Sequence, residues 1–74
     1  MDIRRKTVLI IRSQGQYLVG YVMGTTILRW SESPYDAWAT RKWEDAERVA
    51  RMVDGELMLF NPVAGQLRPA EVRR

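Results

Sequence analysis

Apolar and polar residues alternate along this chain with two different periods, which predict the segments that form strands and the one that forms a helix. Residues 7–13, TVLIIRS, are short and rich in β-branched side chains, which is typical of a strand. The four consecutive apolar residues 8–11 indicate burial on both faces and therefore a central place in a sheet. A turn at Gly15 leads to a second strand at residues 17–23, and residues 26–30 form a third. These segments predict an antiparallel meander.

A helix is predicted at residues 41–53, where apolar residues recur at helical spacing. One face carries the apolar residues Trp43, Ala46, Val49, Ala50 and Val53. Two pairs of opposite charge, each spaced four residues apart, lie on the other face: Glu44 with Arg48, and Glu47 with Arg51. Thr40 is the expected N-cap. Gly55 is the expected left-handed residue that ends the helix.

Residues 56–60, ELMLF, predict the strand that follows the helix, and Asn61-Pro62 ends it. Residues 66–68 are a candidate short added strand, and Pro69 argues against a regular one. The order is therefore β-β-β-α-β. It predicts an α+β fold in which an antiparallel sheet of three or four strands carries one amphipathic helix on one face.

A chain of 74 residues is expected to form one domain. We expect a basic N-terminal arm at residues 1–6, the α+β domain at residues 7–62, and a C-terminal extension at residues 63–74. A domain this small often gains stability by self-association, so a homodimer is one expectation.

The composition limits the catalytic and metal-binding chemistry available to the chain, because it has no cysteine and no histidine. Disulfides, thiolate nucleophiles, catalytic triads of the usual kind and Cys- or His-ligated metals are thereby excluded. Two carboxylate pairs, Glu32 with Asp36 and Asp54 with Glu56, are the remaining candidates for Mg²⁺, and capping and solvation explain them more simply. We expect a protein without enzymatic activity or cofactor.

The same composition bears on location. A small secreted domain would usually carry disulfides, so we expect a cytoplasmic protein. The apolar run at residues 8–11 is too short for a signal peptide or a membrane span, and we expect no membrane association.

The net charge is +3, and the basic excess lies at the two ends of the chain. Six residues there are candidates for contact with nucleic-acid phosphates or with an acidic protein groove: Arg4, Arg5, Lys6, Arg12, Arg73 and Arg74. Charges at chain ends also serve solubility alone, which is the simpler interpretation of these residues.

Bulky aromatic residues gather around the polar loop SESPYD at residues 31–36. Trp30, Tyr35 and Trp38 are candidates for contact with a protein partner, because Trp and Tyr dominate binding hot spots. The alternative is that the two Trp residues fill the small core and that Tyr35 alone is exposed.

A second candidate surface lies on one face of the second strand, where Tyr17 and Tyr21 point the same way. If this face is open, the two rings could stack on a partner or on bases, with Arg12 and Arg29 supplying charge. If the helix covers it, both tyrosines belong to the core or its rim.

The chain opens with the predicted hairpin KTVLIIRSQGQYLV, and four positions mark its helical region: Thr40, Asp45-Ala46, Val49-Ala50 and Asp54-Gly55. In these features the chain resembles small phage and prophage proteins over about residues 6–60. Similar proteins carry an aromatic residue near Ala39, a place that Trp38 and Trp43 take here. Some phage proteins of this size, anti-CRISPR proteins among them, inhibit bacterial defence systems by stoichiometric binding.

These observations predict a non-catalytic protein-binding module. The resemblance implies a phage-derived inhibitor that occludes a bacterial host or defence protein. Two alternatives stay open: nucleic-acid binding through the basic termini and the sheet aromatics, and a homodimeric structural component of a phage.

Overall fold

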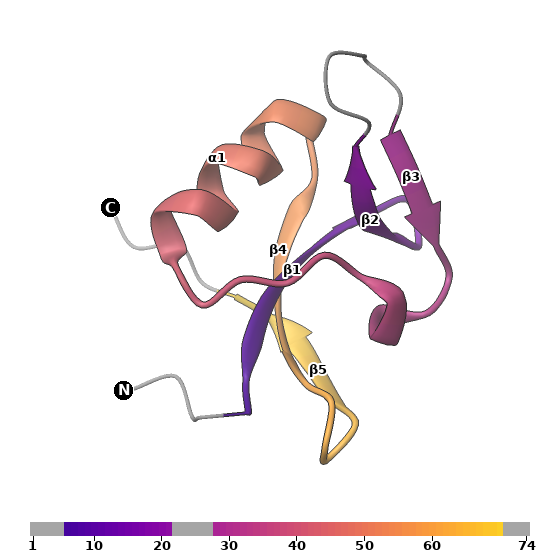
Figure 1. The fold of residues 1–74 in the computed structure, drawn as a ribbon, viewed down its shortest axis with the longest axis vertical. Coiled ribbons are helices and arrows are strands. Elements are labelled where there is room, and N and C mark those ends of the chain that lie inside the picture. Colours follow the sequence, from indigo (N-terminus) through magenta and orange to yellow (C-terminus); the bar gives the residue numbers. More distant parts are fainter. Residues whose placement is uncertain (1–5, 22–27, 71–74) are drawn as a thin grey trace.

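The computed structural model describes residues 6–21 and 28–70. The basic residues Arg4, Arg5, Arg73 and Arg74 lie outside the described residues, as do residues 22–23 and 26–27 of the second and third predicted strands. The described elements follow in the order β1 (Val8–Ser13), β2 (Gln16–Tyr21), β3 (Leu28–Ser31), the 3₁₀ helix η1 (Pro34–Asp36), α1 (Trp43–Val53), β4 (Glu56–Asn61) and β5 (Gln66–Pro69) (Figure 1).

The described strands form one antiparallel sheet in the order β3-β2-β1-β4-β5, with α1 packed against it. This confirms the predicted α+β fold and the central place of β1, where Leu9, Ile10 and Ile11 are 0% exposed. The sheet has five strands instead of three or four, because Gln66–Pro69 pairs with β4. Pro69 is tolerated at the end of an edge strand, where a missing N–H need not break the sheet. The sheet therefore continues beyond residue 62, the expected end of the domain.

A tight turn joins β1 to β2, and the two strands then diverge. Gln14 and Gly15 both have positive φ, 52° and 79°, as the primed turns of two-residue hairpins require. The paired positions of β1 and β2 are the two next to this turn, Arg12 with Tyr17 and Ser13 with Gln16. Farther from the turn, β1 is free to bond with another segment.

Residues 37–40, called the strap below, run between the diverging strands (Figure 1). Thr40 exchanges two backbone hydrogen bonds with Leu9 of β1, at 2.8 and 3.1 Å. The N–H of Trp38 donates to the carbonyl of Leu18 in β2 at 2.8 Å. The strap therefore satisfies backbone groups that β1 and β2 do not satisfy for each other.

The sheet has a core on each face. On the helix face, the buried residues are Leu9, Ile11, Leu18, Ala46, Ala50 and Leu57. On the second face, the buried residues are Ile10, Tyr17, Met58 and Phe60, with Val8, Ala37 and Leu67 packed against them. Side chains alternate across the pleat, so the continuous apolar run of β1 supplies both cores at once.

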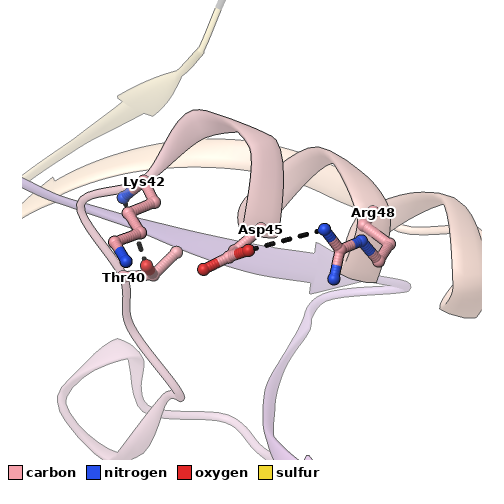
Figure 2. A network of polar contacts seen from close by, with 4 residues as sticks. All are labelled: Thr40, Lys42, Asp45 and Arg48. Atoms are coloured by element: carbon pink, nitrogen blue, oxygen red, sulfur yellow. Dashed lines mark hydrogen bonds and ion pairs between the residues drawn. The ribbon is translucent and has the colours of Figure 1, made fainter.

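Helix α1 begins two residues later than predicted. Its N-cap is Lys42, which makes no side-chain capping bond, and Thr40 is not the cap. The reason is the pairing of Thr40 with Leu9, which holds Thr40 in an extended bridge and delays the first helical turn. The hydroxyl of Thr40 instead accepts a hydrogen bond from the N–H of Lys42 at 3.2 Å, just before the helix (Figure 2).

The end of α1 also differs from the prediction, because Asp54 and not Gly55 is the left-handed residue, with φ 54° and ψ 45°. The N–H of Asp54 reaches the carbonyl of Arg51 at 3.4 Å, and the N–H of Gly55 reaches that of Ala50 at 2.8 Å. This pattern is a Schellman motif. Gly55 is required for a different reason: a Cβ there would lie 2.5 Å from Cγ2 of Ile11.

The two predicted ion pairs on α1, Glu44 with Arg48 and Glu47 with Arg51, are both absent among the described side chains. Arg48 instead lies 3.8 Å from Asp45, one turn before it on the same flank (Figure 2). Exposed pairs are weak, so small differences in side-chain geometry decide which of them form. Within the described ranges, no helix is long and apolar enough to cross a membrane.

Candidate interaction surface

The structure separates the aromatic residues that the sequence grouped together. Trp30 and Trp38 are half-buried and pack against the core of the helix face, as Trp43 does. Tyr17 is 7% exposed and belongs to the core of the second face. Tyr21 ends β2, where its backbone pairs with Leu28, and its side chain is outside the described part of the structure. These placements leave Tyr35 as the exposed aromatic residue among those described.

The candidate basic residues within the described chain, Lys6, Arg12 and Arg29, are all exposed. Arg12 pairs with Tyr17 across β1 and β2, and Tyr17 pairs with Ser31 of β3. Since paired residues share a face and β3 alternates, Arg12 and Arg29 lie on the second face. The tyrosine between them is covered, so these arginines do not flank an open ring.

Tyr35 projects from η1 with 62% of its surface exposed, and local hydrogen bonds fix the loop beneath it. The hydroxyl of Ser33 caps η1 by accepting from the N–H of Tyr35 at 3.2 Å. The hydroxyl of Ser31 accepts from the N–H of Ser33 at 3.1 Å and donates to Asp36 at 3.0 Å. Pro34 begins η1 and restricts its backbone. The polar loop therefore has a fixed backbone that positions Tyr35 before any partner binds.

The inner edge of the Tyr35 ring lies against the β4–β5 hairpin. Its centroid is 5.0 Å from that of Phe60, with the planes at 85°, an edge-to-face arrangement. Such pairs add about 0.5–1.5 kcal/mol beyond the buried area. The phenol oxygen lies over Gly65, where a Cβ would be 3.5 Å away. One side of the ring is thus held by the hairpin while the rest faces solvent.

The β4–β5 turn at residues 62–65 presents a second exposed apolar side chain, Val63, which is 70% exposed. The side-chain oxygen of Asn61 accepts from the N–H groups of Val63 and Ala64 at 3.0 and 3.2 Å. The N–H of Gly65 closes the turn on the carbonyl of Asn61 at 2.8 Å, and Gly65 has φ 70°. This turn is as well fixed as the loop that carries Tyr35.

Val63 was missed from the sequence because it fell in the expected C-terminal extension. A usable signal was present: Asn61-Pro62 and Gly65 are turn residues, and QLRP after them supplies the returning strand. We call Tyr35 and Val63 together the Tyr35–Val63 surface. Met52, 61% exposed, is the remaining large exposed apolar side chain of the described chain and lies on α1, apart from this surface.

Two of the four acidic candidates have structural roles. Asp36 accepts the hydrogen bond from Ser31, and Asp54 ends α1 in the left-handed conformation. Within residues 6–21 and 28–70, no group of three or more acidic residues is placed to hold a metal ion. The feature that stands out chemically is therefore an apolar contact surface.

Comparison of the chain with protein-family models, with curated proteins and with solved structures finds no match.

Proposed function

We propose that this protein is a non-catalytic protein-binding module that contacts its partner through the Tyr35–Val63 surface. One observation carries the proposal: Tyr35 is 62% exposed and yet held in one position by the capped η1 loop and by Phe60. Tyr is enriched among hot-spot residues. A side chain that is already ordered loses little conformational entropy on binding, so more of its contact energy becomes affinity.

The second anchor strengthens this proposal. Val63 projects from a turn that Asn61 holds with two hydrogen bonds, so it too is presented on a fixed backbone. We propose that the partner is a bacterial host or defence protein and that binding occludes its working surface. The resemblance to phage proteins supports this partner class, and the net charge of +3 favours an acidic region around the contact.

The test is capture of a partner from bacterial lysate by the tagged protein, followed by measurement of the affinity for the protein retained. Tyr35→Ala and Val63→Asp are expected to weaken that affinity by at least about tenfold, which corresponds to the roughly 1.4 kcal/mol or more that hot-spot residues contribute. Met52→Asp is the matched control, because Met52 is equally exposed but lies on α1. Equal binding by wild type, Tyr35→Ala and Val63→Asp would refute the surface assignment.

Nucleic-acid binding is a second candidate, supported by the exposure of Arg12 and Arg29 on the same face of the sheet. It predicts a complex whose affinity falls steeply as salt rises. A gel-shift assay at low salt with single- and double-stranded oligonucleotides tests it. Arg12→Gln with Arg29→Gln should weaken the shift, and the absence of a shift with the unaltered protein removes this candidate.

A further inference from the structure

The two edges of the sheet are built differently. β3 and β5 are the edge strands of the described sheet, and an edge strand leaves part of its backbone unpaired. β5 contains Pro69, which lacks an N–H and hinders the addition of another strand. β3, with the sequence LRWS, contains no proline. Of the two edge strands, β3 is therefore the better site for the addition of a further strand.

The side chains of β3 form two distinct rows. Leu28 and Trp30 lie on the helix face, where both are half-buried against the core. Arg29 lies on the second face and is exposed. The helix packs over β1 and β4 and lies away from the β3 edge of the sheet (Figure 1). A strand added beside β3 would thus meet an apolar row on one face and a positive charge on the other.

We propose that β3 binds an extended segment of a protein partner by strand addition, and that this segment alternates apolar and acidic residues. The apolar residues extend the row formed by Leu28 and Trp30, and an acidic residue lies opposite Arg29. Main-chain hydrogen bonds supply affinity and the alternating side chains supply specificity. The inference rests on the proposed protein-binding function but uses a surface other than Tyr35–Val63.

A second copy of this chain fits the β3 edge less well. Two antiparallel β3 strands related by a twofold axis must pair residues of the same face. Centred on Arg29, the pairing sets this arginine against the same residue of the second copy, which is repulsive. Centred on Trp30, it sets two bulky indole rings directly opposite each other. Both copies also carry a net charge of +3, so an acidic partner is electrostatically favoured.

Fluorescence anisotropy with synthetic peptides tests the proposal. The probe is a labelled peptide of about six residues, a common strand length, that alternates valine and glutamate. One comparison peptide carries an N-methyl group on every backbone amide, and another has lysine in place of glutamate. We expect the N-methylated peptide to bind at least about tenfold more weakly, because it cannot form the backbone hydrogen bonds.

Two charge-reversal variants complete the test. Arg29→Glu is expected to weaken binding of the glutamate peptide and to favour the lysine peptide. Arg68→Glu, an exposed arginine on the opposite edge strand β5, is the matched control and should leave the affinity of both peptides unchanged. An N-methylated peptide that binds equally well, or an equal effect of both variants, overturns the proposal.

Sedimentation of the unaltered protein tests whether a second copy of the chain occupies the β3 edge. A dimer that Arg29→Glu dissociates means that a second copy pairs with β3, which also overturns the proposal. The strand-addition proposal and the Tyr35–Val63 proposal can be rejected independently of each other. Loss of the lysate partner in Tyr35→Ala, together with no binding of either peptide, rejects strand addition alone.

Discussion

Substitution of Gly55 by alanine should destabilise the fold by steric overlap with a buried side chain. A Cβ at this position would lie 2.5 Å from Cγ2 of Ile11, and 3.2 Å from both the carbonyl oxygen of Arg12 and Cγ2 of Val53. Ile11 is 0% exposed and lies in the core of the helix face, so it has little room to move. The neighbouring carbonyl belongs to β1, whose pairing with β4 fixes it.

The magnitude follows from the nature of the overlap. Forcing one extra carbon into a well-packed core costs about 1–3 kcal/mol. For a domain of this size the total free energy of unfolding lies near the lower end of about 5–15 kcal/mol. Gly55→Ala should therefore remove a large fraction of the stability. Each kcal/mol corresponds to a fall in Tm of about 4–8 °C for a domain of 60–100 residues.

Urea denaturation followed by tryptophan fluorescence measures the effect, and Gly20→Ala is the matched control. Gly20 also lacks a positive φ, and a Cβ there would meet nothing within 4 Å. Glycine within a strand destabilises the fold by about 0.5–1 kcal/mol relative to alanine, so the Gly20→Ala control should leave the stability unchanged or raise it.

A midpoint for Gly55→Ala equal to that of Gly20→Ala would refute the reasoning. A double variant sharpens the comparison. Ile11→Leu removes the Cγ2 atom that the new methyl group meets, so Gly55→Ala should cost less in that background than in the unaltered protein. Additive effects would show that the destabilisation does not come from this contact.

Three further predictions concern the turns and the helix, each measured as the free energy of unfolding in urea. Asp54→Gly should stabilise by about 0.5–1 kcal/mol, because glycine adopts the left-handed conformation without a Cβ penalty; a loss of stability would contradict this. Asn61→Ala should destabilise by about 1–2 kcal/mol by removing the acceptor of two N–H groups, whereas Asn61→Asp keeps that oxygen and should change little. Asp45→Asn should change stability by less than about 0.5 kcal/mol, because its contact with Arg48 is exposed; a larger change would mean that the pair is more than a surface contact.

Local patterns predicted the fold well where the structure depends on neighbours in sequence. The apolar run of β1 is buried on both faces, and the amphipathic period of α1 places Ala46 and Ala50 in the core. The errors arise where distant residues meet. Thr40 is a good N-cap by type, but its backbone pairs with Leu9, and no local pattern encodes that contact. Likewise, Gly55 matches a helix stop, while its actual constraint is the side chain of Ile11.

The candidate surface shows the same division. Its aromatic composition could be read from the sequence, but the direction in which each ring points could not. Trp30 follows Leu28 by two residues in β3, so both point to the helix face and join the core. Tyr35 lies in a 3₁₀ turn, where strand alternation gives no guidance. Val63 needed the β4–β5 pairing to be recognised as a turn residue.

The strap has a consequence for how the domain opens. Leu9 and Leu18 belong to the two diverging parts of the sheet, and both bond to residues 37–40. Local unfolding of the strap would therefore release amides of β1 and of the strap together, since Leu9, Trp38 and Thr40 donate the shared bonds. In hydrogen exchange these three amides should behave as one cooperative unit. The strap directly follows η1, so a partner bound to Tyr35 should slow the exchange of all three amides.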